Sequence, residues 1–416
     1  MMYFIKQIFE ALRFAVNSVI VNKMRTLLSL MGITIGIFAI VSVFTAIDSM
    51  ERFLKSNLET FGSTTLYIDK WPWMPEEDGV YKWWEYANRP NFDVEQFEEI
   101  ATALEPNITG AATVFSINFN LRNNKIARQT TTMAISHDYN VVSEMELGSG
   151  RYFTLSESMG AHPVAILGAD IADELFEGVD PIGAQIYADG QRITVVGVLK
   201  RQGTNPFGPQ SDKSAFVPIE YASSRVNARW YSHTIILMGK QDINLDEFKA
   251  ITDHTIRRIR RQPFNAKSNF AVNEVTAVSQ QLDTLFSMIN LVGGIIGVFA
   301  ILVGGFGVAN IMFVSVRERT AQIGIQKAVG AKPYAILMQF VFEAIMLSVA
   351  GGAVGLLLIW ALAAVATSAT GFEIILTAEN IGVGLGISSA VGAIAGIFPA
   401  YSAASLPPVV AIYKNS

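Results

Sequence analysis

Four long apolar stretches constrain this chain more than any other feature of its sequence. Residues 26–47 and 284–316 carry no charge, residues 333–370 are interrupted only by Glu343, and residues 381–400 form the fourth stretch. About 20 helical residues cross the hydrocarbon core of a bilayer. The sequence therefore predicts an α-helical membrane protein with four transmembrane helices, placed at residues 25–47, 285–314, 333–370 and 381–400.

A cleaved signal peptide is the alternative for the first stretch. Its apolar core would hold roughly 7–15 residues and would end at a small-residue cleavage site. Here a longer stretch is followed by the charged sequence Asp48-Ser49-Met50-Glu51-Arg52. We therefore expect an uncleaved anchor. Apolar residues at helical spacing in residues 1–24 predict an amphipathic helix on the cytoplasmic leaflet before it.

The distribution of charge predicts the orientation. Residues 1–25 and residues 315–332 each contain four basic residues and one acidic residue. The positive-inside rule places both segments in the cytoplasm, together with the tail at residues 401–416. Residues 371–380 then form a short outer loop, and residues 48–284 form a large extracytoplasmic block. Since the total formal charge is −5 and the other parts are net positive, this block is acidic.

The extracytoplasmic block has the pattern of a mixed α+β domain inserted between the first and second transmembrane helices. Strand-like runs occur at residues 64–69, 112–121, 129–135, 162–167, 192–199, 215–219 and 233–238, and helical patterns at residues 93–104, 169–176 and 245–261. We expect one domain in two lobes. The sequence has no cysteine, no hydrolase motif and no histidine spacing typical of metal sites, so neither a metal nor catalysis is predicted.

One segment of this block is rich in tryptophan: Trp71, Trp73, Trp83 and Trp84. Neighbouring prolines indicate a loop. The rings could bind an apolar ligand or an extracytoplasmic partner, or lie at the headgroup level of the bilayer. Alternatively, they cover a small local core.

The second to fourth apolar stretches contain glycines spaced four apart. The pairs are Gly293 and Gly297, Gly351 and Gly355, Gly382 and Gly386, and Gly392 and Gly396. This spacing lets helix backbones approach closely in a membrane. We expect a tightly packed bundle that includes a second copy of the chain.

Glu343 is an ionisable residue within the third stretch, where a charge is costly. It is either a functional intramembrane group or a structural hydrogen-bonding group that contacts a neighbouring helix. The other three apolar stretches contain no Lys, Arg or His partner for it.

The most informative segment is cytoplasmic and reads Ser-Val-Arg-Glu-Arg-Thr-Ala-Gln-Ile-Gly-Ile-Gln-Lys-Ala-Val-Gly-Ala-Lys-Pro over residues 315–333. Its charged start, small apolar set and Gly-x-x-Pro ending predict a short helix parallel to the membrane. The alternative is a plain basic loop that only satisfies topology.

This segment resembles the signature S-V-x-E-R-T-x-E-I-G-I-R-K-A-x-G-A of the MacB/FtsX-like ABC transporter permeases. Arg317 occupies a variable site, and Gln322 and Gln326 replace residues that are usually charged. Residues 23–36, 147–153, 180–183, 195–198 and 398–408 also resemble this family, and MacB-type permeases most closely.

The resemblance implies a homodimeric permease of the bacterial cytoplasmic (inner) membrane that docks a separate ABC ATPase subunit. The residues implied in ATPase coupling are Arg317, Glu318, Arg319, Thr320, Ile323, Gly324, Ile325, Lys327, Ala328 and Gly330. The sequence lacks a G-x-x-x-x-G-K-[ST] loop, so we expect no cofactor in this chain and no hydrolysis by it, with ATP and Mg bound by the partner.

In this family, closure of the ATPase is transmitted along the second transmembrane helix to the outer domain. The implied substrates are a peptide, lipoprotein, antibiotic or other amphipathic molecule, with a periplasmic adaptor as a further partner and no nucleic acid. The alternative is an FtsX-like signalling module that activates an extracytoplasmic hydrolase without transport. The extracytoplasmic domains of FtsX-type proteins are generally smaller, which favours the first interpretation.

Overall fold

A computed structural model describes residues 23–59, 61–62, 64–75, 79–143, 145–203, 210–370 and 372–407. The chain divides into two compact units, one of residues Met1–Phe53 with Asp283–Ser416 and one of residues Leu54–Leu282. The amphipathic helix predicted for residues 1–24 lies outside the described residues, except for its last two positions.

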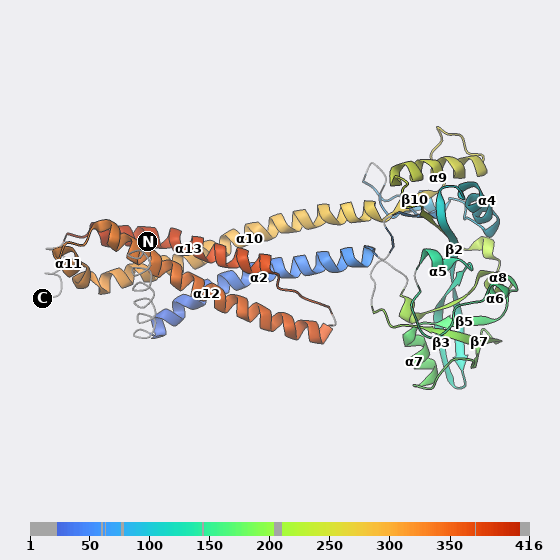
Figure 1. Cartoon of the computed structure of the whole chain (residues 1–416), viewed down its shortest axis with the longest axis horizontal. Coiled ribbons are helices and arrows are strands. Elements are labelled where there is room, and N and C mark those ends of the chain that lie inside the picture. Colours follow the sequence, from blue (N-terminus) through green and yellow to red (C-terminus); the bar gives the residue numbers. More distant parts are fainter. Residues whose placement is uncertain are drawn as a thin grey trace. The chain divides into compact units, whose positions relative to one another are not determined.

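The first unit is helical. Within the described residues it contains, wholly or in part, four helices that are long and apolar enough to cross a membrane. They are α2 (Lys23–Glu59), α10 (Val275–Glu318), α12 (Pro333–Thr370) and α13 (Ala378–Ser405), with the short helix α11 (Thr320–Ala328) between α10 and α12 (Figure 1). Four transmembrane helices are thus confirmed.

Three of the long helices extend beyond the apolar stretches. Helix α2 ends at Glu59 and α10 begins at Val275, so both pass charged residues where the apolar stretches end. No proline or glycine interrupts residues 48–59 or 275–292, and an acidic residue alone does not end a helix. Helix α13 starts earlier than predicted because the Thr377 hydroxyl accepts a hydrogen bond from the Asn380 amide at 3.1 Å.

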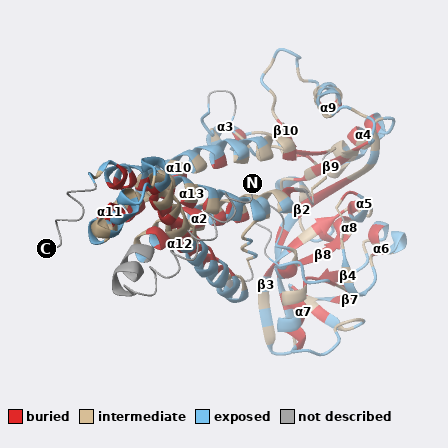
Figure 2. Cartoon of the chain, turned by 60° about the vertical axis from the view of Figure 1, so that its left-hand side comes forward, coloured by how far each residue is buried: buried red, intermediate tan, exposed pale blue. Residues whose placement is uncertain are grey.

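Residues on the inner faces of these helices are buried and their outer faces are largely exposed (Figure 2). The buried residues form an apolar core, and many of the exposed side chains are also apolar. The core includes Ile37 of α2, Met312 of α10, Phe340 of α12 and Ala403 of α13. Exposed apolar side chains on a membrane helix face lipid or another membrane helix.

The second unit is built on one sheet of ten strands. Its main path runs β10-β1-β9-β2-β3-β8-β5-β7-β4, and β6 pairs with β2 and β7. The bounds are β1 Thr65–Asp69, β2 Ile108–Asn123, β3 Ile126–Ile135, β4 Leu147–Gly150, β5 Val164–Leu167, β6 Gln185–Ala188, β7 Gln191–Leu199, β8 Ser214–Pro218, β9 Thr234–Gly239 and β10 Ala271–Glu274. Most pairings are antiparallel, and β3–β8 and β5–β7 are parallel.

Helices pack against this sheet around separate apolar clusters. Figure 1 shows α4 (Val94–Leu104) and α9 (Leu245–Ile259) at one end of the domain and α7 (Ala169–Phe176) at the other. The shorter helices are α3 Trp83–Ala87, α5 Tyr139–Val142, α6 Leu155–Met159 and α8 Ile219–Ser223, with 3₁₀ turns at Ser211–Lys213 and Ala228–Trp230. The α+β class is confirmed, and any division into two lobes lies within one continuous sheet.

The sequence analysis did not predict strands β4, β6 and β10. Each has four residues and lacks the continuous apolar run that marks the equally short β5, so its pattern is not distinctive. Strand β10 matters for the site described below because it runs directly into α10.

Candidate functional site

Helix α11 is the short helix expected in the cytoplasmic segment. It begins after Arg319, and the chain then turns through Gly330, whose φ of +98° suits a residue without a side chain. Proline is the first residue of α12, where its missing amide hydrogen costs nothing. The Thr320 hydroxyl donates to the Val316 and Arg317 carbonyls at 3.1 and 2.8 Å, which ties the start of α11 to the end of α10.

Burial separates the predicted coupling residues into an inner and an outer set. Ile323 is 2% exposed and lies in the helical core, and Gly324 is also buried. Ile325 is 58% exposed and Val329 is 85% exposed. The exposed positions of this segment are Arg317, Glu318, Gln322, Ile325, Gln326, Ala328, Val329 and Gly330. The two glutamines that depart from the family signature therefore both lie on exposed positions.

Glu343 has a charged partner that comes from outside the apolar stretches, which themselves contain no Lys, Arg or His, as expected. A guanidinium nitrogen of Arg319 lies 3.2 Å from the Glu343 carboxylate, and the two side chains are 22% and 10% exposed. The long arginine side chain reaches Glu343 from the joint between α10 and α11, outside the apolar stretches. Of the two interpretations of Glu343, the structure favours a structural contact with a neighbouring element.

Lys327 also contacts the permease's own helices. Its ammonium group donates hydrogen bonds to the carbonyls of Ala404 and Leu406, both at 2.6 Å. Helix α13 ends at Ser405, so Lys327 satisfies carbonyls that have no partner within that helix. A cation is also favourable at the negative end of the helix dipole.

The predicted packing glycines lie in different surroundings. A Cβ atom added at Gly392 would lie 2.8 Å from the Ala344 carbonyl oxygen, and one at Gly396 would lie 2.5 Å from the Ala344 Cβ, so α12 and α13 are in close contact. Added Cβ atoms at Gly293, Gly297 and Gly355 would lie 3.1–3.4 Å from residues of α2.

The remaining three glycines behave differently. The Gly351 carbonyl accepts a hydrogen bond from the Thr34 hydroxyl at 3.0 Å. Added Cβ atoms at Gly382 and Gly386 would meet nothing within 4 Å. Within the described residues, these two glycines therefore do not mediate contact between helices of one chain.

The tryptophan segment is not a continuous loop, because Trp83 and Trp84 begin the short helix α3. Trp73 packs on Tyr67 with ring centroids 5.0 Å apart, and Lys70 lies over the Trp71 ring. Trp83 and Trp84 stay 61% and 50% exposed. Trp73 thus packs on a buried tyrosine while staying 38% exposed, Trp71 is covered in part by a lysine, and Trp83 and Trp84 face outward.

A pocket of about 690 Å³ lies between this segment and strand β10. Its lining includes the apolar side chains of Trp73, Met74 and Phe270 and the charged side chains of Arg89, Lys249, Lys267 and Glu274. Sequence reasoning identified the tryptophans, but not strand β10 or the lysines, since these are distant in the chain.

Asn273 fixes the wall of this pocket. It is 7% exposed, its side-chain oxygen accepts from the Trp73 amide at 2.8 Å, and its side-chain amide donates to the Trp71 carbonyl at 3.0 Å. Arg89 donates to the Lys70 and Phe270 carbonyls at 3.1 and 3.3 Å. The tryptophan segment is therefore held against β10 by specific hydrogen bonds.

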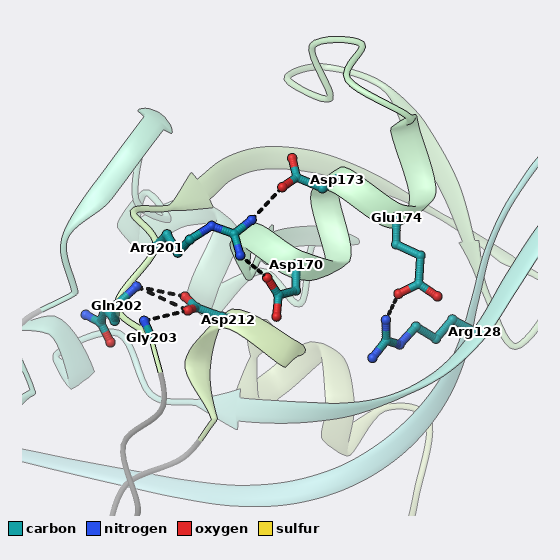
Figure 3. Close-up of polar contacts among 8 residues, drawn as sticks. All are labelled: Arg128, Asp170, Asp173, Glu174, Arg201, Gln202, Gly203 and Asp212. Carbon is teal, nitrogen blue, oxygen red and sulfur yellow. Dashed lines mark hydrogen bonds and ion pairs between the residues drawn. The ribbon is translucent and has the colours of Figure 1, made fainter. Parts of the chain in front are cut away.

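A second polar cluster was not anticipated from the sequence (Figure 3). Arg201 pairs with Asp170 and Asp173, and the buried carboxylate of Asp212 accepts hydrogen bonds from the Gln202 and Gly203 amides. Arg128 pairs with Glu174 nearby. Since Asp212 has its acceptors occupied and the other charges pair with one another, this cluster fastens α7 and the chain after β7 rather than forming a reactive site. Within the described residues, no group of three or more His, Asp or Glu residues is arranged to hold a metal.

Family profiles match most of the chain. The profile described as MacB-like periplasmic core domain matches residues 26–254, and the profile described as FtsX-like permease C-terminal matches residues 294–408. The chain belongs to the MacB/FtsX-like family of ABC transporter permeases. The resemblance inferred from residues 315–333 is thus confirmed.

Individual relatives of this permease are moderately similar over nearly its whole length. The macrolide export ATP-binding/permease protein MacB of Azoarcus sp. (strain BH72) is 29% identical over 405 residues, which cover 97% of this chain and 59% of that protein. An uncharacterized ABC transporter permease, YknZ of Bacillus subtilis (strain 168), is 29% identical over 97% of this chain and 98% of its own length. The permease thus spans about three fifths of the MacB relative.

Two solved structures resemble its extracytoplasmic part. The periplasmic region of MacB from Actinobacillus actinomycetemcomitans matches 56% of this chain and 98% of that structure, with a TM-score of 0.45 and 14% identity. The extracellular domain of YknZ matches 50% of this chain and 98% of that structure, with a TM-score of 0.39 and 18% identity.

Four membrane helices and a MacB-like core domain define where the permease resides. It is a multi-pass protein of the cytoplasmic (inner) membrane with a large extracytoplasmic domain between its first two transmembrane helices.

Proposed function

We propose that this permease is the membrane subunit of an ABC transporter in which a separate ATPase subunit binds ATP and Mg. Hydrolysis there drives a conformational change in the extracytoplasmic domain that exports or extracts a peptide, lipoprotein, antibiotic or other amphipathic molecule. The relative YknZ, which the permease matches over 98% of that protein's length, is named an ABC transporter permease with no mention of ATP binding, and this supports a division of labour between two subunits.

The exposed side of α11 is the observation that carries this proposal. Ile325 and Val329 are four residues apart, are 58% and 85% exposed, and therefore lie close together on the segment. They are part of the predicted cytoplasmic segment, outside the four apolar stretches. An exposed apolar pair beside buried Ile323 is suited to a groove on a partner protein.

Helix α10 gives this docking side a continuous connection to the pocket. It has 44 residues, which corresponds to roughly 66 Å, and it ends at Glu318 just before α11. Its first residue follows β10 directly, and Ala277 in its first turns lines the pocket beside Trp73. We infer that movement of α11 is passed along α10 to this pocket, where substrate or a periplasmic adaptor binds.

A homodimer accounts for two glycines that contact no other helix among the described residues. Gly382 and Gly386 are spaced for close helix approach, yet an added Cβ atom at either position would meet nothing. A second copy of the permease, or lipid, covers this part of α13.

The alternative function, FtsX-like signalling without transport, would use the same coupling helix. The MacB-like match over residues 26–254 favours transport.

The proposal is tested with Val329→Asp, which places a charge at the centre of the proposed ATPase interface. We expect the variant to insert normally and to bind the ATPase at least tenfold more weakly, because a carboxylate without a partner would be desolvated there. Phe264→Asp, at a 78% exposed apolar position of the extracytoplasmic unit, is the matched control and should bind normally.

Two results would count against the proposal: ATP hydrolysis by the purified permease alone, or unchanged ATPase binding by the Val329→Asp variant. A vesicle assay then separates transport from signalling. ATP-dependent extraction of a fluorescent lipopeptide from the membrane supports transport, and ATP hydrolysis without extraction supports signalling.

A further inference from the structure

The two ends of helix α11 are held by charged side chains that contact two different helices. Arg319, directly before α11, reaches Glu343 on α12 at 3.2 Å. Lys327, in the last turn of α11, donates to the carbonyls of Ala404 and Leu406 at the end of α13, both at 2.6 Å. Neither contact is between residues of one helix, so both depend on where α11 sits.

The Arg319–Glu343 ion pair does not lie on the exposed surface of the helices. Glu343 lies about 15 Å along α12 from its start, and its side chain is only 10% exposed. A carboxylate at such a position is retained only where a partner compensates its charge. Arg319 has no side-chain capping role, since α11 has no side-chain hydrogen bond at its N-cap. Its guanidinium is used instead to join the start of α11 to α12.

The Lys327 contact acts at the opposite end. The ammonium group replaces hydrogen bonds that the last carbonyls of α13 cannot make within their own helix. Between the two charged contacts, Ile323 is 2% exposed and packs in the same core as Ile336 and Ala403. Helix α11 is thus fixed to α12 by the residue directly before it, to α13 by its last turn, and to the core in between.

We propose that Arg319, Glu343 and Lys327 form a two-point clamp that makes α12 and α13 move with α11, so that displacement of α11 is not delivered to α10 alone. The proposal rests on the coupling role of α11 proposed above and assigns its inward charged residues a task separate from ATPase docking. Docking is left to Ile325 and Val329 on the exposed side. The clamp residues are positioning residues.

The clamp is tested first without any ATPase. The chain has no cysteine, so a single cysteine at exposed Gln322 carries one spin label on α11. In the full-length permease in nanodiscs, we expect the label to become clearly more mobile in the double variant Arg319→Met/Glu343→Gln and in Lys327→Met. Lys332→Met, at an exposed cation just after α11, is the control and should leave label mobility unchanged.

The double variant is used because either single change could leave a buried charge unpaired and prevent folding. If the two residues act as a pair, the label in the double variant is no more mobile than in the more mobile of the two single variants. If their structural roles were independent, the two increases in label mobility would add. Lys327→Arg keeps a cationic donor and should restore the low mobility that Lys327→Met loses.

The second measurement is coupling to the ATPase. We expect the affinity of both clamp variants for the ATPase to stay within about twofold of the wild-type affinity. We expect the permease-dependent stimulation of hydrolysis to fall at least tenfold. If wild-type permease neither binds nor stimulates an ATPase, the proposed function fails, while the label still reports on the clamp. If label mobility in both clamp variants equals that of wild type, the clamp is wrong, whatever the ATPase does.

Discussion

The contact between α12 and α13 makes a sharp prediction for Gly392→Ala. The added Cβ would lie 2.8 Å from both the Ala344 carbonyl oxygen and the Ile345 Cα, and 2.7 Å from the Ser348 hydroxyl. The first two are backbone atoms, which cannot rotate away as a side chain can. Ordinary contact begins at 3.4 Å, so the two helices must separate locally by about 0.6 Å.

The cost follows from overpacking. Forcing a methyl group into a closely packed interface typically destabilises by about 1–3 kcal/mol. Alanine also has a higher helix propensity than glycine, by about 1 kcal/mol. The matched control Gly307→Ala, on the transmembrane helix α10, gains the propensity without the clash, because no described atom lies within 4 Å of its added Cβ. The two variants should therefore differ by about 1–3 kcal/mol, with Gly392→Ala the less stable.

The assay is equilibrium unfolding of the full-length permease in mixed micelles with increasing sodium dodecyl sulfate, followed by circular dichroism of the helices. Gly392→Ala should unfold at a lower detergent fraction than wild type or Gly307→Ala. Equal midpoints for the two variants would refute the reasoning, since they share the chemistry of the change and differ only in their surroundings.

Two further predictions concern the extracytoplasmic unit. His233 is buried, its Nε2 donates to the Ala228 carbonyl, and burial lowers its pKa. As pH falls below about 6.5, the histidine of the unfolded state takes up a proton before that of the folded state, so the protein should lose stability. Thermal unfolding between pH 7 and 5 should show a shallower loss in His233→Phe, and an unchanged slope would contradict the assignment. Asn273→Leu removes both hydrogen bonds to the tryptophan segment and should destabilise its attachment to β10 by about 1–3 kcal/mol. Increased quenching of tryptophan fluorescence by acrylamide would report this, and unchanged quenching would show that ring packing alone holds the segment.

The sequence by itself determined the membrane spans, the α+β character of the inserted domain and the family. A bilayer imposes one requirement, about 20 apolar residues in a row, and that requirement is local in the chain. The helices α4, α7 and α9 were predictable for a similar reason, because a side chain's position on a helix follows from its spacing alone. Family motifs are also local runs of residues.

Only the tertiary structure decided which of the equally spaced glycine pairs lie in contacts between helices. The pair Gly382 and Gly386 has the same spacing as Gly392 and Gly396, yet the first pair meets nothing and the second contacts α12. Spacing determines which residues share a helix face, but not which face another helix covers.

The charged residues of the coupling segment follow the same rule. In the sequence, Arg319 and Lys327 are indistinguishable from exposed Arg317 and Lys332. The partners of Arg319 and Lys327 lie on helices α12 and α13, dozens of residues along the chain. A long basic side chain can reach in several directions, and the nearest unsatisfied acceptor determines which direction it takes. That acceptor exists only once α12 and α13 have packed against α11, so its position is a property of the folded bundle.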